Sequence, residues 1–334
     1  MRLSALDLSP ILAGETAGDA LSHSLALAEH AERLGLSRLW LAEHHNAAAL
    51  ACPCPELLIA RMGAATSALR LGAGGIMLPN HSPLKVAETF RVLEAMYPGR
   101  IDLGLGRAPG TDPRTAAELR RGARITGDDF PEQLSALLAY QSPDELPREP
   151  FTSTTVAIPA GVDSPEIFIL SSSGYGAELA ARRGLGLAFA HHMNPRDAAA
   201  ALRRYRETFQ PSRYRSKPHA IASVSVVCAE TTADARHLAT SGELAMLRLA
   251  QGRRDLPLAT AEEAAAFEWD TEAKAVRRMF GMAPVVGAVD EVATRLTTLA
   301  DDSGADELML LTMVHDQSAR RRSYALVADA LSGV

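Results

Sequence analysis

The sequence predicts an α/β fold, a (β/α)8 TIM barrel with insertions over its C-terminal mouth. Short apolar runs alternate with helical patterns almost throughout the chain, the runs number eight, and the unusual polar residues come directly after them. A length of 334 residues is ordinary for one such barrel, and neither a linker nor an internal repeat divides 1–334. We therefore expect a single domain.

The predicted strands are short, mostly apolar runs that end at glycine, proline or polar residues. Such nearly continuous apolar runs are typical of parallel strands that are buried on both faces. The eight runs are 2–7, 38–42, 69–78, 100–106, 166–170, 185–190, 220–229 and 307–312.

Helical patterns separate these strands. The first ends at Gly35, and two others begin with Pro55 and Pro83, because proline is tolerated in the first turn of a helix. The predicted helices are 19–35, 55–67, 83–96, 131–140, 175–183, a segment after Pro195, 231–250, 270–280, 289–300 and 317–331.

Three segments fit neither pattern. Residues 107–130 begin with a proline-containing loop and continue as a polar, arginine-rich stretch, and 143–165 are proline-rich. Residues 251–268 are polar and alanine-rich without clear periodicity. We expect 107–130 to be an insertion over the mouth and 251–268 to be a mobile excursion beside it, so that both can close over a site.

Composition excludes several classes of protein. The formal net charge is −6 and no basic block is present, which argues against nucleic-acid binding. No stretch reaches the roughly 18 apolar residues that a membrane span needs. Three cysteines do not form a disulfide framework in a chain of this size, so we expect a reduced, cytoplasmic location.

The candidate site residues gather at the ends of successive predicted strands. Because the carboxyl ends of parallel barrel strands meet at one mouth, we expect these residues to form one site. They are Glu43, His44 and His45 after the second strand, Gly74 and Gly75 at the end of the third, Arg107 after the fourth, 171–176 after the fifth and His191 after the sixth.

The run SSSGYG at 171–176 lies between a strand and a helix, so its backbone N–H groups and hydroxyls could cradle a phosphate. An ordinary capped turn is the alternative. Arg107, one strand away, could supply a permanent charge to the same phosphate. The pair Gly74–Gly75 could support a flat ligand against bare backbone, or could only relieve crowding inside the barrel. Together these features predict a phosphorylated cofactor.

Two competing motifs fail on inspection. In the string GLGRAPG at 104–110 the third glycine is displaced from its place in a dinucleotide-binding loop, and Pro109 blocks the helix that such a loop requires. The histidine pairs, with Cys52 and Cys54, show no spacing of a known metal motif, so we predict no catalytic metal.

Four segments taken together resemble the bacterial-luciferase-like, flavin-dependent monooxygenases, in particular the single-component members that tailor secondary metabolites. The resemblance covers most of the chain and implies an FMN-utilising (β/α)8 barrel. The segments are AEHHN at 42–46, GAGGIMLPNHSPLKVAE at 72–88, PGRIDLGLGRAPGTD at 98–112 and SSSGYGAELAARRGLGLAFAHH at 171–192.

The resemblance also implies roles for individual residues. His44 matches the catalytic histidine of the family, with Glu43 and His45 beside it. Gly74–Gly75 matches a non-prolyl cis dipeptide that supports the flavin ring. The residues expected to bind the cofactor are Gly74, Gly75, Arg107, Ser172, Ser173, Gly174, Tyr175, Gly176 and His191.

The chain departs from the family pattern at two positions. Gly176 replaces a hydroxyl residue that contacts phosphate, which puts one phosphate contact in doubt. Gly106 replaces a reactive cysteine, which argues against efficient luminescence.

The implied function is monooxygenation of a small organic substrate, such as a polyketide in antibiotic biosynthesis, by reduced FMN and O2 through a flavin C4a-peroxide. A separate NAD(P)H:flavin reductase would supply the reduced FMN, because the chain has no second nucleotide fold. His44 would exchange a proton, and the family implies a homodimer. Two alternatives stay open: a deazaflavin (F420)-dependent oxidoreductase and a non-catalytic flavin-binding protein.

Overall fold

A computed structural model describes residues 1–122, 127–141, 155–279 and 284–332. Part of the predicted insertion at 107–130 and most of the proline-rich segment at 143–165 lie outside these residues. The remainder of the chain is sufficient to test the predicted barrel.

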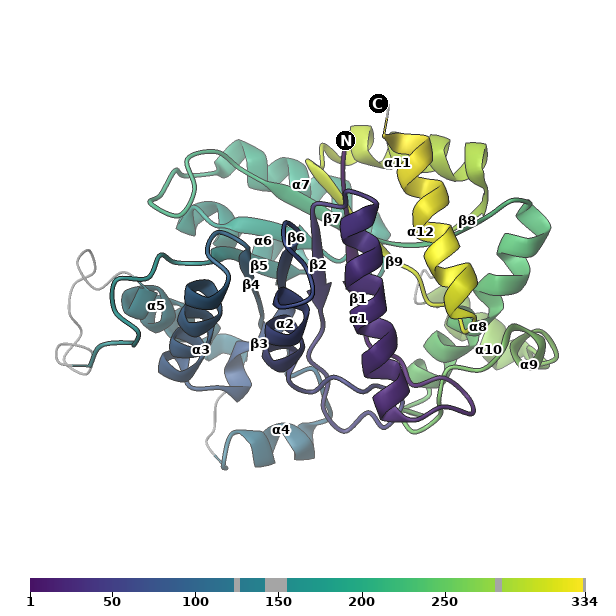
Figure 1. The fold of residues 1–334 in the computed structure, drawn as a ribbon, viewed down its shortest axis with the longest axis horizontal. Helices are drawn as coiled ribbons and strands as arrows, with labels where there is room; N and C mark the ends of the chain where they lie inside the picture. The colour runs from purple at the N-terminus through teal and green to yellow at the C-terminus, as the bar shows by residue number, and fades with distance from the viewer. Residues whose placement is uncertain (123–126, 142–154, 280–283, 333–334) are drawn as a thin grey trace.

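Eight parallel strands close into a barrel, with helices packed around the outside (Figure 1). The strands follow one another around the ring in the order β1 to β7 and then β9, which pairs with both β7 and β1, and β6 pairs with β7. The predicted (β/α)8 fold is confirmed. The strands of the ring are β1 (Arg2–Asp7), β2 (Arg38–Leu41), β3 (Arg70–Met77), β4 (Ile101–Gly106), β5 (Glu166–Ser171), β6 (Gly186–Phe189), β7 (Ala220–Ala229) and β9 (Glu307–Leu311).

The predicted helices are also found, and each lies in the sequence between strands or at the C-terminal end. They are α1 (Ala17–Arg33), α2 (Pro55–Gly63), α3 (Pro83–Met96), α5 (Phe130–Gln141), α6 (Gly174–Arg183), α7 (Pro195–Thr208), α8 (Thr232–Ala250), α10 (Thr271–Met279), α11 (Val289–Ser303) and α12 (Gln317–Leu331). Two 3-10 turns, η1 (Leu78–Asn80) and η2 (Gly127–Asp129), complete the connections.

Besides the 3-10 turns, one strand and two α-helices of the described residues were not predicted. A short strand, β8 (Val285–Ala288), pairs in parallel with the C-terminal end of β7, outside the closed ring. Helix α4 (Pro113–Leu119) lies in the insertion and begins at the capping residue Asp112. Helix α9 (Ala261–Ala265) lies in the segment predicted to be irregular.

The segment 251–268 is attached to the barrel. The Leu258 N–H donates to the Ile11 carbonyl at 2.8 Å, and the Ala13 N–H donates to the Leu258 carbonyl at 2.9 Å. The Leu258 side chain is buried. Two backbone hydrogen bonds and an apolar anchor therefore hold this part of the segment to the loop after β1, and the mobility expected of 251–268 stays a prediction.

A buried ionic network fills the N-terminal end of the barrel. Arg38, the first residue of β2, donates to Asp102 at 2.7 Å and to Glu307 at 2.9 Å. Burial alone would raise the pKa of Glu307, but the hydrogen bond from His219 and the charge of Arg38 lower it to about 2. Paired charges of this kind close the end of the barrel that lies opposite the strand C-termini.

The C-terminal mouth lies at the bottom of Figure 1, and both chain termini lie at the top. Helix α4 and the α9–α10 region lie toward this end of the molecule, on different sides (Figure 1). Within the described residues, no helix is long and apolar enough to cross a membrane.

Candidate active site

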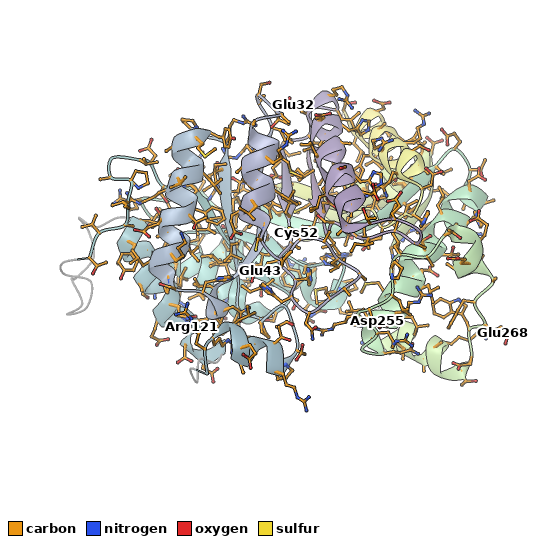
Figure 2. The ribbon with its side chains drawn as sticks, turned by 60° about the horizontal axis from the view of Figure 1, so that its bottom comes forward. Glu32, Glu43, Cys52, Arg121, Asp255 and Glu268 are labelled. Carbon is orange, nitrogen blue, oxygen red and sulfur yellow. The ribbon has the colours of Figure 1, made fainter. Side chains whose placement is uncertain are left out.

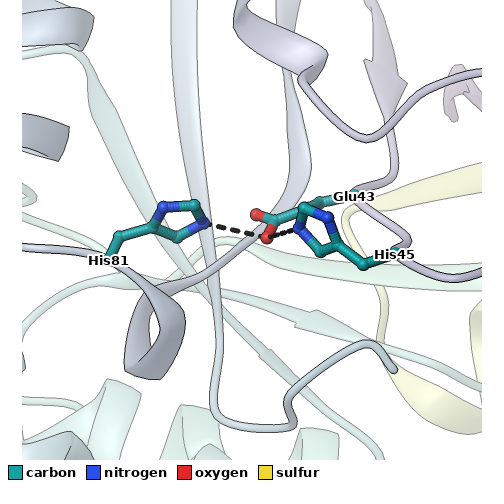
Figure 3. Close-up of side chains that lie close together, drawn as sticks. All are labelled: Glu43, His45 and His81. Carbon is teal, nitrogen blue, oxygen red and sulfur yellow. Dashed lines mark hydrogen bonds and ion pairs between the residues drawn. The ribbon is translucent and has the colours of Figure 1, made fainter. Parts of the chain in front are cut away.

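Glu43 lies at the centre of a hydrogen-bonded cluster directly after β2. Its Oε1 accepts a hydrogen bond from His45 Nε2 at 2.7 Å and another from His81 Nε2 at 2.8 Å (Figure 3). Its Oε2 accepts from the Met77 N–H at 2.9 Å. The carboxylate is buried and is therefore held in one orientation by the ends of β2 and β3. Figure 2, in which the mouth is turned toward the viewer, shows Glu43 near its middle.

The cluster favours an ionised carboxylate. Burial alone would raise the pKa of Glu43, but the hydrogen bond and charge of His81 outweigh burial, and the pKa lies below its ordinary value. Burial alone would lower the pKa of His81, because burial disfavours the charged imidazolium. The hydrogen bond to Glu43 outweighs burial, and the pKa of His81 lies above its ordinary value. Each partner therefore stabilises the charged form of the other.

The same three residues provide the donor set of a divalent metal. The ligand atoms of Glu43, His45 and His81 lie within 4.8 Å of one another, and two imidazoles with one carboxylate are common zinc ligands. The separations of 2.7 and 2.8 Å are, however, those of hydrogen bonds between each imidazole and the carboxylate. We therefore interpret the cluster as a hydrogen-bonded support.

His44 has no such partner. Its Nδ1 atom is buried and makes no hydrogen bond to any part of the chain that the structure describes. Burial lowers the pKa of His44 below its ordinary value, while Glu43 opposes this effect. The ring is consequently neutral at pH 7 and can accept a proton.

The peptide bond between Gly74 and Gly75, within β3, is cis. Added Cβ atoms would meet the Trp40 ring at 2.9 Å from Gly74 and the Gly104 carbonyl oxygen at 2.6 Å from Gly75. Close packing inside the barrel thus requires glycine at both positions. Contact with a flat ligand stays a prediction.

Arg107 and Tyr175 meet at the start of α6. The Arg107 guanidinium lies 4.9 Å from the centre of the Tyr175 ring, and both side chains are exposed. Ser173 is the N-cap of α6, yet its side chain makes no capping hydrogen bond. A guanidinium thus lies beside helical N–H groups that no side chain caps, an arrangement that fits an anion.

The structure gives physical reasons for both departures from the family pattern. A Cβ at Gly176 would collide with Ser171 Oγ, so Ser171 occupies the space of the missing hydroxyl residue. A Cβ at Gly106 would lie 2.8 Å from Met77 Sδ, so Met77 occupies the space of a cysteine there.

Two further predicted residues, Ser172 and His191, lie at the same mouth. The Ser172 carbonyl accepts from the Asn194 side chain at 2.9 Å, which ties the β5 loop to the start of α7. His191 is half-buried, and burial lowers its pKa. With His192 it lines a largely apolar cavity beside β7 and α8.

The loops at the mouth support one another. The Asn80 side chain donates to the Pro109 carbonyl at 2.8 Å, and the Asn46 side chain donates to Asp112 at 2.8 Å. Gly110 takes a positive φ of 63°, and a Cβ there would lie 3.1 Å from the Glu43 carbonyl. The loops after β2, β3 and β4 therefore form one connected wall.

His81 is the functional candidate that sequence reasoning missed. It follows β3 in the string LPNHSP, at the same end of the barrel as the predicted site, and that position was the available signal. Its distance of 38 residues from Glu43 in the sequence concealed the contact.

Comparisons with known proteins identify the family of the chain. The family model described as luciferase-like monooxygenase matches residues 1–307. A luciferase-like monooxygenase of Escherichia coli strain K12 is 39% identical over 98% of this chain and 96% of its own length. The N-acetyl-S-alkylcysteine monooxygenase of Bacillus subtilis strain 168 is 33% identical over 99% of this chain and 98% of its own.

The chain is also similar to solved structures. The crystal structure of apo-MsnO8 is 40% identical, with a TM-score of 0.90 over 99% of this chain and 98% of that chain. More distant barrels show the fold alone. They include the oxygenating constituent of 3,6-diketocamphane monooxygenase in complex with FMN, at 19% identity and a TM-score of 0.68, and an F420-dependent secondary alcohol dehydrogenase, at 15% and 0.67. The chain belongs to the luciferase-like monooxygenase family, a family of oxygenating oxidoreductases.

Proposed function

We propose that the protein is a flavin-dependent monooxygenase that uses reduced FMN, supplied by a separate reductase, and O2 to oxygenate a small organic substrate. One observation carries the choice of a phosphorylated flavin: Arg107 lies over Tyr175 at the uncapped start of α6. When bound, reduced FMN supplies the two electrons that activate O2.

The phosphate of FMN fits the Arg107 side of the mouth. A guanidinium can bind two phosphate oxygens at once, and the N–H groups at a helix start add a positive field. The candidate ligands on α6 and its N-cap are Ser173, Gly174, Tyr175 and Gly176, with Ser172 preceding them. Gly74 and Gly75 would lie against the flavin ring, and His191 would lie beside it.

His44 is the proposed proton-transfer group. Its neutral ring and unpartnered Nδ1 suit a general base, and Glu43 lies beside it in the chain. The Glu43 carboxylate, fixed by His45 and His81, would hold the backbone of this turn in place.

The phosphate assignment is tested by replacing Arg107 with alanine. Loss of a charge-assisted hydrogen bond, worth about 1.5–3 kcal/mol, should weaken FMN binding on the order of 10- to 150-fold. Riboflavin, which lacks the phosphate, should bind the variant and the wild type equally. Titration of each flavin, monitored by its fluorescence, measures both affinities.

Arg114→Ala is the matched control, because Arg114 is an exposed arginine in the same insertion. It should leave the affinity for both flavins unchanged. An equal loss of FMN and riboflavin affinity in Arg107→Ala would show that Arg107 does not bind phosphate.

The activity itself is tested with reduced FMN and, separately, reduced F420. Oxygen consumption coupled to an oxygenated product with FMN supports the proposal. Substrate reduction with F420 and no oxygen uptake supports the deazaflavin alternative, and flavin binding without turnover supports a flavin-binding protein.

A further inference from the structure

An apolar cavity opens at the mouth beside α8. The C-terminal ends of β7 and β9 form one wall, α8 forms another, and His191 and His192 lie at its edge after β6. Most lining side chains are aliphatic or thioether groups, among them Val226, Met246 and Leu311. Such a lining favours a ligand that is apolar over most of its surface.

The cavity and the proposed FMN site occupy different arcs of the barrel mouth. Glu43, Arg107 and Ser173 follow β2, β4 and β5, whereas the cavity is bounded by residues of β6, β7 and β9 and by Leu8, which follows β1. His191 lies where the two arcs meet. A molecule in the cavity would therefore lie next to the cofactor without occupying its phosphate site.

The charge of the lining restricts the ligand further. The lining residues of the described chain include no lysine or arginine, and Glu243 is the one acidic residue among them. A carboxylate or sulfonate placed here would lose its hydration and gain no cation from the lining. A carbonyl or hydroxyl group, by contrast, can bond to Ser225 or to a histidine of the lining.

We propose that this cavity binds the organic substrate, and that the substrate is a neutral, largely apolar molecule with few polar groups. This inference deepens the proposed function and rests on it. It separates the chain from members of the family that act on anions: N-acetyl-S-alkylcysteine, the substrate in the name of the Bacillus subtilis relative, carries a carboxylate.

The test is calorimetric titration of the flavin-free wild-type protein with octan-2-one and with octanoate, which share an eight-carbon skeleton and differ in charge. We expect octan-2-one to bind at least about tenfold more tightly than octanoate, a difference of about 1.4 kcal/mol. N-acetyl-S-benzylcysteine, a second anionic probe, should also bind more weakly than octan-2-one. Equal or tighter binding of either anion would overturn the proposal.

Two variants locate the binding. Ala245→Phe fills the cavity from α8 and should abolish octan-2-one binding. Leu249→Phe adds an aromatic ring on the exposed face of the same helix and should leave binding unchanged. Octan-2-one binding that persists in Ala245→Phe would place the ligand elsewhere and reject the cavity.

These titrations contain no flavin, so they separate the two proposals. Selective octan-2-one binding by a protein that fails to bind FMN would contradict the proposed function and leave the cavity assignment intact. FMN binding that depends on Arg107, without selective octan-2-one binding, would support the proposed function and overturn the cavity assignment.

Discussion

His44 is the residue on which the chemistry depends most directly. Replacing it with alanine should leave FMN affinity within a factor of about two, because the phosphate ligands lie on other strands. Substrate oxygenation should fall on the order of 10²- to 10⁴-fold, the usual contribution of a general acid or base. Flavin titration and product formation measure the two effects, and unchanged turnover would remove His44 from the mechanism.

The pH dependence of the wild-type rate follows from the burial of His44. Its pKa is lowered, so the ring loses its ability to accept a proton only below the ordinary value of 6.5. The rate of oxygenation should therefore stay high at neutral pH and fall only as the pH drops below the ordinary histidine value. A rate that rises on acidification would contradict the assignment of a neutral base.

His81 should stabilise the fold more at acidic than at alkaline pH. Its pKa is raised by Glu43, so its contribution is complete below 6.5 and disappears as the pH rises through the folded-state value. Glu43, whose pKa is lowered, contributes above 4.5 and loses its contribution as the pH falls. His81→Gln should therefore lower the Tm more at about pH 5.5 than at about pH 8.5.

His237→Gln is the control for that experiment, because His237 is an exposed histidine whose contact with Glu262 is 3.4 Å long. It should change the Tm little at either pH. Equal losses of Tm at both pH values in His81→Gln would show that packing, and not charge, accounts for the role of His81.

The sequence allowed the strand-end residues to be predicted, but not all the contacts between them. Glu43, Arg107 and Ser173 are recognisable because each follows an apolar run that ends abruptly. The contact between Glu43 and His81 depends on the register of β2 against β3, which pairs Leu41 with Ala73, and no local pattern specifies that register. Long-range pairing is therefore what the sequence alone does not reveal.

At the scale of elements, the strands of the ring were predictable because each is a buried run with few polar residues. The strand β8 was missed because it has four residues and alternates buried and half-buried side chains. Helix α9 was missed because its signal is a capping box, Thr260 with Glu263, in a segment that otherwise has no periodicity.

That capping box can be tested by replacing Thr260 with alanine. The Thr260 Oγ1 accepts the Glu263 N–H at 3.1 Å, and a Glu263 carboxylate oxygen accepts the Thr260 N–H at 3.2 Å. Loss of the cap should cost about 0.5–2 kcal/mol locally. Hydrogen exchange should therefore accelerate over 258–265 while the barrel strands stay protected.

Thr298→Ala on α11 is the matched control, because that exposed threonine bonds only within its own helix. It should leave exchange over 258–265 unchanged. Rapid exchange of this segment in the wild type, as fast as in an unstructured peptide, would instead support the mobile excursion that the sequence suggested.

At the scale of the whole molecule, one end of the barrel carries the candidate binding site and the other carries buried ion pairs that stabilise the fold. The mouth carries partly exposed histidines, an uncapped helix start and an apolar cavity. The opposite end carries buried ion pairs around Arg38, in which the charges are already satisfied by one another. Changes at the closed end should therefore alter stability and leave binding intact.

Arg38→Met tests this separation. The substitution leaves Asp102 and Glu307 buried without their shared cation, which should cost about 3–5 kcal/mol in the free energy of unfolding. Arg322→Met, which breaks the exposed pair with Glu230, should cost less than about 1 kcal/mol. Urea unfolding measures both values.

The penalty of Arg38→Met should also depend on pH. The pKa of Glu307 is lowered to about 2, so its contribution to stability is present above 4.5 and is lost as the pH falls toward 2. The difference between variant and wild type should accordingly shrink from pH 7 to about pH 3. FMN affinity of the folded variant should equal that of the wild type, because Arg38 and Arg107 lie at opposite ends of the barrel. Weakened FMN binding without loss of stability would show that the closed end contributes to the site.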